Sequence, residues 1–328
     1  MSAARAGRPS VVVTRRLPAP VEDRLARDFD ARLNRDDHPF TAAELGEALR
    51  TADALLPTVT DRLTADVLAV EPLRARILAN YGVGFNHIDV GAARARGLTV
   101  TNTPDVLTDD TADDAVMLML MVARRAVEGD RHVRSGAWTG WGPTHMLGTK
   151  VSGKTLGLIG LGRIGRAVAR RAHHGFAMKI VFHDPYPPPP AVVAELGAEP
   201  RGSVEAVLRE ADFVSLHSPA TPETRHLINA ERLALMRPSA FLINTARGDI
   251  VDEAALVAAL KARRIAGAAL DVFEREPQVT PELLTLDNVV LLPHLGSATQ
   301  ETRVAMGLRA CDNLKAFFAG APPGDRVV

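Results

Sequence analysis

The sequence lacks several features that would place it in a special class of protein. It contains a single cysteine, Cys311, which has no partner for an internal disulfide and no metal-ligand spacing around it. No run of about 20 apolar residues is present, and the apolar residues 11–13 are too few for the core of a signal peptide. We therefore expect a cytoplasmic protein with no metal site and no membrane contact.

An excess of charge of either sign is also missing. The chain has 39 Lys and Arg residues and 39 Asp and Glu residues, so its formal net charge is +0. A balanced chain has no global field that attracts nucleic acid or an anionic membrane, and a charged ligand must be bound by local groups. With 328 residues, 46% of them hydrophobic, the chain is long enough for two globular domains of about 150 residues each.

What is present is a regular alternation of short apolar runs and helical patterns. The first part of the chain contains predicted strands at residues 10–14, 76–80 and 98–102, and a predicted helix at 41–52. The second part contains six predicted strands, at residues 155–159, 179–183, 212–217, 240–244, 266–271 and 288–292. Such alternation is typical of βαβ units. It predicts an α/β fold with two Rossmann-like domains, each a doubly wound parallel sheet, and a cleft between them.

Between the two parts lies a predicted helix at residues 111–127, whose residues 116–122 are all apolar. A helix that is apolar on nearly all sides is expected to be buried on nearly all sides. It could lie in a core, cross between the domains or pack against a second subunit. A further helix is predicted at 300–319, and we expect it to return to the first domain.

A glycine-rich motif, G-x-G-x-x-G, occupies residues 160–165. It follows a strand-like segment and precedes a helical pattern over 166–172, which is the setting of a dinucleotide-binding motif. Gly160 permits the tight turn, Gly162 leaves room for a pyrophosphate beside the backbone, and Gly165 lets the helix pack closely on the strand. The N-terminus of the helix adds free N–H groups and a positive dipole end.

Asp184 follows the predicted strand 179–183 and lies 19 residues after Gly165. An acid at this place accepts hydrogen bonds from the ribose hydroxyls of the cofactor and repels a 2′-phosphate. The following Pro185 and the prolines at 187–190 offer no cation for such a phosphate. The segment predicts NAD as the cofactor, with NADH preferred over NADPH, although Asp184 would also suit a simple turn.

Three polar residues, Arg247, Glu276 and His294, each follow an apolar strand in the second part of the chain. Ligands of an open parallel sheet bind beyond the carboxyl ends of its strands, so we expect the three residues to share the site of the glycine loop. His217 also ends a strand and is expected to line the cofactor site through its backbone. Further candidates beside these strand ends are Ser218, Pro219, Thr245 and Gly296.

The chemistry of these three side chains is complementary. A 2-keto acid carries a carboxylate beside a carbonyl, and Arg247 offers a planar fork of donors to both. Hydride transfer from a nicotinamide places negative charge on the carbonyl oxygen, which a histidine such as His294 can protonate. A carboxylate such as Glu276 favours the imidazolium and orients the ring. Taken singly, each residue also fits a surface turn, a loop charge or a core histidine.

The combination of motifs resembles the D-isomer-specific 2-hydroxyacid dehydrogenases, especially their glyoxylate/hydroxypyruvate reductase branch. The matching segments are residues 80–84, 101–104, 160–165, 244–248, 270–273 and 293–296. The likeness covers nearly the whole chain, and the motifs are specific in combination.

The resemblance implies a particular division of the chain. A substrate-binding domain would comprise residues 1–103 and 295–328, and an NAD-binding Rossmann domain would comprise residues 104–294. It also implies a homodimer, in which an arm at residues 136–147 with two tryptophans reaches the partner subunit. Ordinary packing would equally account for these tryptophans.

The resemblance also assigns roles to single residues. Arg247 would bind the substrate, His294 would be the acid/base, Glu276 would pair with His294, and the backbone of Val83 and Gly84 would hold the substrate carboxylate. The cofactor site would also be lined by Thr111, Arg163, Ile164, Thr224, Ala246 and Asp271.

Two departures from the family pattern bear on cofactor and substrate. Many reductases of this branch carry a basic residue where this chain has Asp184, and they use NADPH. The segment 85–89 around His87 is also less usual. These departures leave open which 2-keto acid and which cofactor the chain uses.

Three alternative functions remain open. A formate dehydrogenase of the superfamily would be expected to have Gln in place of Glu276, and a phosphoglycerate dehydrogenase often has a C-terminal regulatory domain, for which a chain ending at Val328 leaves no room. A non-catalytic NAD-sensing scaffold would lack a catalytic residue or add an interaction segment. Since all three catalytic residue types are present, we predict an NAD(P)-dependent dehydrogenase that reduces a small 2-keto acid, glyoxylate or hydroxypyruvate.

Overall fold

The computed structural model describes residues 7–328, so the first six residues of the predicted domain 1–103 lie outside the described part of the chain. The chain divides into two compact units. Unit 1 runs from the N-terminal part to Leu107 and resumes over Thr299–Val328, and unit 2 is Thr108–Ala298.

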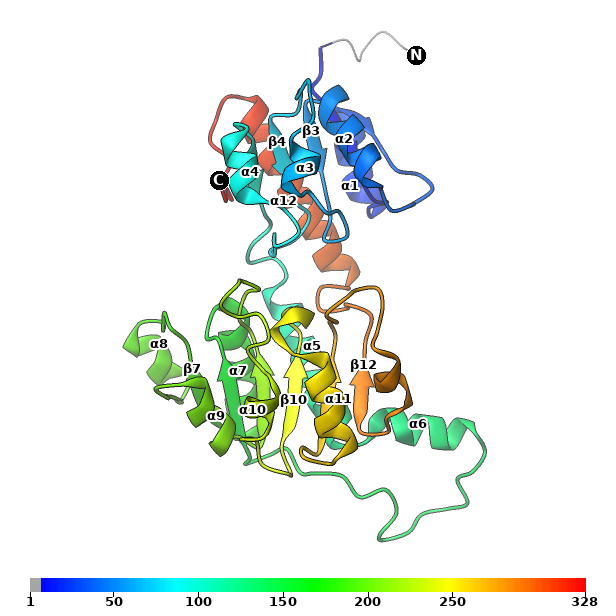
Figure 1. Cartoon of the computed structure of the whole chain (residues 1–328), viewed down its shortest axis with the longest axis vertical. Coiled ribbons are helices and arrows are strands. Elements are labelled where there is room, and N and C mark those ends of the chain that lie inside the picture. The colour runs from blue at the N-terminus through cyan, green and yellow to red at the C-terminus, as the bar shows by residue number, and fades with distance from the viewer. Residues whose placement is uncertain (1–6) are drawn as a thin grey trace. The chain divides into compact units, whose positions relative to one another are not determined.

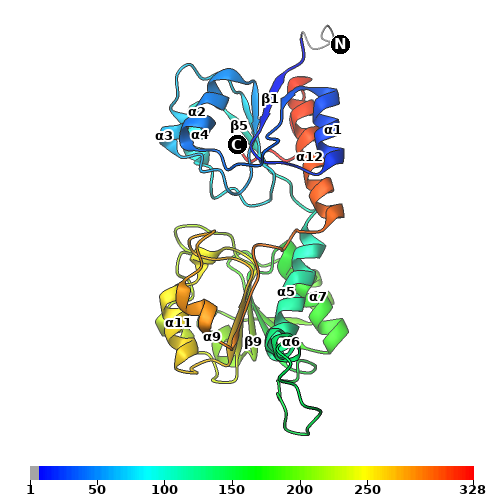
Figure 2. The same cartoon turned by 90° about the vertical axis from the view of Figure 1, so that its right-hand side faces the viewer.

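Unit 1 is built on a five-stranded parallel sheet with the strand order β2-β1-β3-β4-β5. The strands are β1 (Ser10–Val13), β2 (Asp30–Arg32), β3 (Ala54–Leu56), β4 (Ile77–Ala79) and β5 (Thr99–Thr101). The helices are α1 (Ala19–Asp28), α2 (Ala42–Thr51), α3 (Ala65–Leu68), α4 (Val90–Ala95) and α12 (Gln300–Phe318). Figure 2 shows α2, α3 and α4 on one face of this sheet and α1 and α12 on the other.

The C-terminal part of the chain belongs to unit 1 because α12 packs on α1. Gly307 of α12 faces Val21 of α1 so closely that a Cβ at Gly307 would collide with the valine side chain. After the helix, the Val327 N–H donates to the Val100 carbonyl at 2.7 Å, which attaches the C-terminal residues to β5.

Unit 2 is built on a seven-stranded parallel sheet with the order β12-β11-β10-β9-β6-β7-β8 (Figure 1). The strands are β6 (Thr155–Ile159), β7 (Lys179–His183), β8 (Ala198–Pro200), β9 (Phe213–Leu216), β10 (Phe241–Asn244), β11 (Gly267–Leu270) and β12 (Val289–Leu291). The α-helices are α5 (Thr108–Ala123), α6 (Ala126–Arg134), α7 (Arg163–Phe176), α8 (Pro190–Glu195), α9 (Val204–Glu210), α10 (Ala230–Leu233) and α11 (Glu253–Lys261). Two 3-10 helices, η1 (Gly248–Ile250) and η2 (Pro281–Thr285), follow β10 and β11.

The sheet of unit 2 has apolar layers on both faces. Figure 2 shows α5 and α7 on one face and α9 and α11 on the other, and each pair covers its own buried cluster of aliphatic side chains. All four residues of β9 and of β10 are buried, as are those of β11. Strands buried on both faces need continuous apolar sequence. This explains why the sequence predicted these strands from uninterrupted apolar runs.

The order in which successive strands are added to the sheet reverses between β6 and β9. From β6 the chain proceeds through β7 to β8 on one side, and from β9 it proceeds through β10 and β11 to β12 on the other. In doubly wound sheets, ligands bind outside the carboxyl ends of the strands at such a switch point. A ligand site is therefore expected at the loops after β6, β9, β10, β11 and β12.

The predicted α/β class with two parallel, doubly wound sheets is confirmed. Three strands were not predicted, namely β2, β3 and β8, so the sheet of unit 2 has seven strands in place of the six expected. Each of the three has only three residues, and none contains a β-branched residue. Their sequences therefore carry no strand signal, and they are strands because they pair with β1, β1 and β7.

The prediction of one helix over 111–127 was wrong in its bounds and its burial. The segment forms α5, which ends at Ala123, and α6, which begins at Ala126. Between them Arg125 adopts a left-handed conformation, with φ of 54°, which stops the first helix. Met117 is 42% exposed, so one face of α5 is open although the opposite face is in the core.

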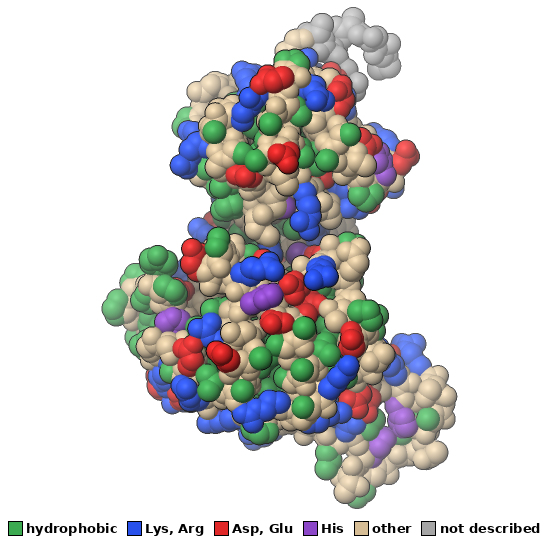
Figure 3. Space-filling view, viewed as in Figure 1, with side chains coloured by type: hydrophobic (Ala, Val, Ile, Leu, Met, Phe, Trp, Pro, Cys, Tyr) green, Lys and Arg blue, Asp and Glu red, His purple; other side chains and the backbone are tan. Residues whose placement is uncertain are grey.

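The surface carries charges of both signs. Figure 3 shows basic and acidic side chains mixed over the visible face of each unit, and many form ion pairs such as that of Arg201 with Glu210 at 2.7 Å. Within residues 7–328, none of the helices combines the length and the apolar character that crossing a membrane requires.

Candidate functional site

The loop after β6 has the shape of a phosphate-binding turn. Gly160 adopts a φ of 95°, and a Cβ there would lie 2.8 Å from the backbone carbonyl of His217. A Cβ at Gly165 would collide with the Gly160 carbonyl oxygen, whereas Gly162 faces open space. The loop thus packs tightly against β9 and leaves a bare backbone at the N-terminus of α7, where Arg163 and Ile164 begin the helix. These features fit the pyrophosphate of a dinucleotide.

Asp184 lies at the end of β7 and faces this loop. Its Oδ2 accepts a hydrogen bond from the Leu161 N–H at 2.7 Å, and its Oδ1 accepts one from the Tyr186 N–H at 2.8 Å. The carboxylate is therefore fixed beside the glycine loop, at the place where a ribose would follow the pyrophosphate.

The segment after β9 forms the opposite wall of the glycine loop. The His217 N–H donates to the Ile159 carbonyl at 2.8 Å, and the Ser218 hydroxyl donates to the same carbonyl at 3.2 Å. Burial lowers the pKa of His217 to about 4, so its ring is neutral at neutral pH. The Thr224 hydroxyl donates to the Pro219 carbonyl at 2.7 Å and closes the loop.

The loop after β10 presents Arg247. The Asn244 side chain receives the Ala246 N–H at 3.0 Å and donates to the Arg247 carbonyl at 2.8 Å, which fixes the turn. The neighbouring Thr245 is 7% exposed, and its hydroxyl has no partner within residues 7–328. Burial lowers the pKa of Arg247, while the charges of Glu276 and Asp249 oppose this effect.

His294 and Glu276 form a hydrogen-bonded ion pair. Their Nδ1 and Oε2 atoms are 2.9 Å apart, and the side chains are 29% and 33% exposed. The other oxygen of Glu276 accepts the Phe273 N–H at 3.0 Å, which orients the carboxylate. An ionised carboxylate can only accept, so Nδ1 of His294 is the donor, and Nε2 is the atom that can exchange a proton with a ligand.

The protonation state of Glu276 follows from these contacts. Burial by itself raises the pKa of a carboxyl group. The hydrogen bond and charge of His294, the Phe273 N–H and the charge of Arg247 outweigh burial and lower the pKa of Glu276. Glu276 is therefore ionised at neutral pH and accepts the hydrogen bond from Nδ1 of His294.

The loop that carries His294 is held by Asp271. The Asp271 carboxylate accepts the N–H groups of Leu295 at 2.5 Å and Gly296 at 2.8 Å, and its carbonyl accepts the His294 N–H at 2.9 Å. The Thr111 hydroxyl of α5 donates to the Gly296 carbonyl at 2.9 Å. This network brings α5 and the ends of β11 and β12 together.

The predicted residues of unit 2 thus gather in two connected groups. The glycine loop, Asp184 and the segment 217–219 surround the N-terminus of α7, and Glu276, His294, Asp271, Thr111 and Gly296 are joined by hydrogen bonds. Arg247 is close enough to Glu276 for their charges to interact. Sequence reasoning missed Asn244, which supports Arg247, and Asp114, a buried carboxyl group in the middle of α5. The only signal for Asp114 was that it directly precedes the apolar residues 115–122 of the same helix.

Val83 and Gly84 lie in a separate loop of unit 1. The Asn80 amide donates to the carbonyls of Gly82 and Gly84, both at 3.0 Å, and the Asn102 amide donates to the Val83 carbonyl at 2.9 Å. These bonds to the carbonyl oxygens fix the conformation of the loop.

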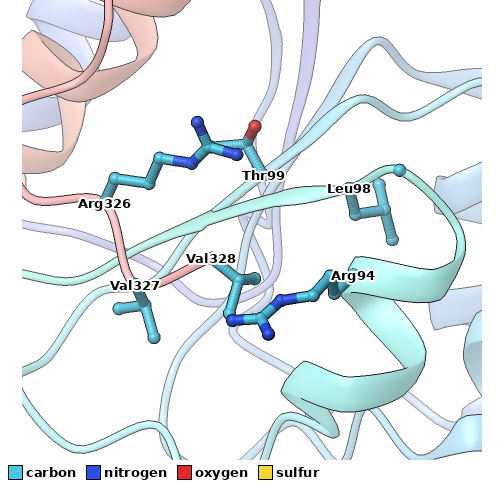
Figure 4. A pocket seen from close by; sticks show the side chains of 7 residues that line it. Arg94, Leu98, Thr99, Arg326, Val327 and Val328 are labelled. Atoms are coloured by element: carbon cyan, nitrogen blue, oxygen red, sulfur yellow. The ribbon is translucent and has the colours of Figure 1, made fainter.

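Two cavities of the chain lie away from these residues. One, of about 450 Å³ in unit 1, is lined by Arg94 of α4 and by the C-terminal residues, with Arg94 and Arg326 on either side of Val328 (Figure 4). The other, of about 340 Å³, lies in unit 2 between α5, the Leu147–Thr149 segment and β12. Neither contains a residue of the predicted site.

The chain matches the family model described as D-isomer specific 2-hydroxyacid dehydrogenase, NAD binding domain, over residues 116–296. It is 47% identical to the glyoxylate reductase of Pyrococcus furiosus over 320 residues, which cover 96% of this chain and 94% of the relative. It is 47% identical to the glyoxylate reductase of Thermococcus litoralis over 324 residues, covering 98% and 97%.

Solved structures agree over nearly the full length. A protein of Thermus thermophilus superimposes with a TM-score of 0.89 and 44% identity, covering 97% of this chain and 100% of that one. The NADPH-dependent glyoxylate/hydroxypyruvate reductase of Sinorhizobium meliloti, in complex with NADP and malonate, superimposes with a TM-score of 0.88 and 37% identity, covering 98% and 97%.

The ion pair of Glu276 gives a testable dependence of stability on pH. Because the pKa of Glu276 is lowered by folding, its ionised form stabilises the protein above the ordinary value of 4.5, and this contribution is lost as the pH falls below it. We expect Glu276→Gln to lower Tm relative to the wild type at neutral pH, and the difference to shrink in acid. The exposed Glu282→Gln is the control for loss of one negative charge. An equal Tm difference at both pH values would contradict the pairing.

Proposed function

Because the chain belongs to the D-isomer-specific 2-hydroxyacid dehydrogenase family, we propose that it reduces glyoxylate or hydroxypyruvate to the corresponding 2-hydroxy acid. The observation that carries this proposal is the His294–Glu276 pair, with Nδ1 and Oε2 2.9 Å apart, at the strand ends that also present Arg247. The curated glyoxylate reductases that are 46–47% identical to this chain support the choice of substrate. The predicted family and the predicted nicotinamide-dependent dehydrogenase activity are confirmed by these relatives.

In the proposed mechanism, Arg247 binds the substrate and polarises its carbonyl. The guanidinium forms two parallel hydrogen bonds, which suit a carboxylate with an adjacent carbonyl oxygen. His294 donates the proton from Nε2 to the carbonyl oxygen. Glu276 stabilises the imidazolium before this proton transfer and orients the ring. The nicotinamide cofactor, when bound, supplies the hydride.

We assign the cofactor to residues 104–294 and the substrate carboxylate to residues 1–103 with 295–328. The match of the NAD-binding family model to residues 116–296 supports the first assignment. The backbone of Val83 and Gly84, whose neighbouring carbonyls are bound by Asn80 and Asn102, supports the second. The further residues proposed to line the cofactor site are Thr111, Gly160, Gly162, Arg163, Ile164, Gly165, Asp184, His217, Ser218, Pro219, Thr224, Thr245, Ala246, Asp271, His294 and Gly296.

The first test is a steady-state measurement with glyoxylate and hydroxypyruvate. We expect the wild type to reduce both with NADH, and His294→Ala to lose roughly 10²–10⁴-fold in kcat, the usual contribution of general acid catalysis. NADH binding, followed by fluorescence, should survive because the glycine loop and Asp184 provide most of the contacts to the dinucleotide. His174→Ala, which removes an exposed histidine of α7, should leave turnover unchanged. Absence of turnover by the wild type with either keto acid and either cofactor would overturn the proposal.

We further propose that NADH is preferred over NADPH. Asp184 supports this, because its carboxylate is fixed beside the glycine loop by the N–H groups of Leu161 and Tyr186. A nearby cation, Arg201, is already paired with Glu199 and Glu210. The Sinorhizobium relative is NADPH-dependent, so the preference depends on the residues of this chain.

A comparison of the two cofactors tests this preference. Placing like charges together costs several kcal/mol, and about 1.4 kcal/mol corresponds to tenfold, so we expect kcat/KM to favour NADH by about tenfold or more. Asp184→Ser should narrow the ratio of kcat/KM with NADH to kcat/KM with NADPH, whereas Glu231→Gln, which removes an exposed carboxylate of α10, should not. A wild type that favours NADPH would refute this role of Asp184.

We also propose that the chain forms a homodimer through the arm at residues 136–147. Of the nine exposed large hydrophobic side chains of residues 7–328, five lie between Met117 and Leu147, and Trp141 is 85% exposed. Exposed apolar side chains concentrated in one segment mark an association surface.

Sedimentation tests the dimer. We expect the wild type to sediment as a dimer, and the double variant Trp138→Ser, Trp141→Ser to shift toward the monomer with NADH binding retained. Leu284→Ser removes an exposed apolar side chain outside the arm and should leave the dimer intact. A monomeric wild type would overturn the proposal of a homodimer. A double variant that remains a dimer would show that the arm is not the dimer interface.

A further inference from the structure

Asp114 is a buried carboxyl group that the mechanism does not use. It lies in the middle of α5 and is 6% exposed. Its Oδ2 atom has no hydrogen-bond partner within residues 7–328. A buried carboxylate without a donor is costly, and each such group in a folded protein calls for an explanation.

The position of Asp114 relates it to the loop of His294. The Thr111 hydroxyl donates to the Gly296 carbonyl at 2.9 Å, and Asp114 follows Thr111 by about one helical turn, on the same side of α5. Figure 2 shows α5 running along the sheet on the side of α7. Both oxygens of the nearby Asp271 already accept N–H groups of the loop. Asp271 therefore has the donors that an ionised carboxylate needs, whereas the Oδ2 atom of Asp114 has none among residues 7–328.

The surroundings of Asp114 favour a proton on its carboxyl group. Burial raises its pKa to about 7; the negative charge of Asp271 acts in the same direction, and His294 acts in the opposite direction. Among the described residues, the strands packed on α5, namely β10, β11 and β12, have no titratable side chain. Arg171 of α7 is bound to Asp109 and Asp113 on the exposed side of α5.

We propose that Asp114 is a further acidic residue of the nicotinamide site, and that it releases its proton to solvent when the oxidised cofactor binds. This inference rests on the proposed function, which requires the nicotinamide and His294 to face the same carbonyl group. The oxidised ring carries a positive charge and the reduced ring carries none, so an ionised Asp114 attracts only the oxidised form. The O–H bond of Asp114 is the only bond that changes, and the electron count of the cofactor is unaltered by its binding.

The coupling has a defined sign. Binding that releases a proton becomes tighter as the pH rises, and by linkage a rise in pH and the oxidised cofactor favour the same ionised state of Asp114. The affinity for NAD⁺ therefore increases through neutral pH, and the affinity for NADH does not. The ratio of the affinities for NAD⁺ and NADH therefore changes with pH because of Asp114.

The test measures the dissociation constants of NAD⁺ and NADH between about pH 6 and about pH 8 for the purified full chain. Coupling between two sites is typically 5–150-fold, so we expect the wild type to bind NAD⁺ about fivefold or more tightly at the higher pH. Calorimetry in two buffers of different ionisation enthalpy should show protons released with NAD⁺ and fewer with NADH. Asp114→Asn should lose most of the NAD⁺ dependence while still binding both forms.

Two further variants complete the design. Asp113→Asn removes the neighbouring carboxylate, which is 66% exposed and bound to Arg171, and should keep the wild-type slope. Asp114→Ser is a second variant without a titratable group, to be used if the Asn variant does not fold. The change of slope that both Asp114 variants share, and that Asp113→Asn lacks, reports Asp114.

The outcomes separate this inference from the proposed function. If neither cofactor binds to the wild type, the proposed function is overturned, and this inference falls with it. If both bind and the NAD⁺ affinity of the wild type does not change with pH, only the role of Asp114 is overturned. A slope that Asp114→Asn or Asp114→Ser retains in full overturns it as well.

Discussion

The two hydrogen bonds from the Leu295 and Gly296 N–H groups to the Asp271 carboxylate hold the rest of the site in place. They tie the loop after β12 to the end of β11, and the bond from the His294 N–H to the Asp271 carbonyl adds a third attachment. Backbone hydrogen bonds therefore fix the position of His294 beside Glu276. The same loop receives the Thr111 hydroxyl, so α5 is aligned with it.

Three carboxyl groups near one histidine behave differently because they have different donors. Glu276 is bound to His294, and the pKa of Glu276 is lowered in spite of its burial. Asp271 is bound to backbone N–H groups, yet burial still raises its pKa. The Oδ2 atom of Asp114 has no donor among residues 7–328, and burial raises the pKa of Asp114 to about 7. One residue class can thus supply a permanent charge, a structural anchor and a proton-binding group within a single site.

The glycine motif and the strand ends allowed the family and the α/β fold to be predicted, because buried parallel strands need continuous apolar sequence and phosphate turns need glycine. The roles of Arg247, Glu276 and His294 stay predictions, although the structure has the hydrogen bond between the last two. Strands β2, β3 and β8 could not be predicted, since none of them contains a β-branched residue and they are strands because they pair with β1 and β7. Asp114 was missed because its significance lies in what surrounds it, and Asp271 and His294 are more than 150 positions away in the sequence.

The close packing of Gly248 on the backbone of Phe273 and Glu274 has a mechanical consequence. No side chain separates the loop after β10 from the loop after β11, so the two backbones bear directly on one another. Arg247 precedes the contact on one loop and Glu276 follows it on the other. A displacement of either loop therefore displaces the other, because no flexible side chain lies between them to absorb the movement. The backbone segments that carry the cation and the carboxylate are thus held against each other by direct contact.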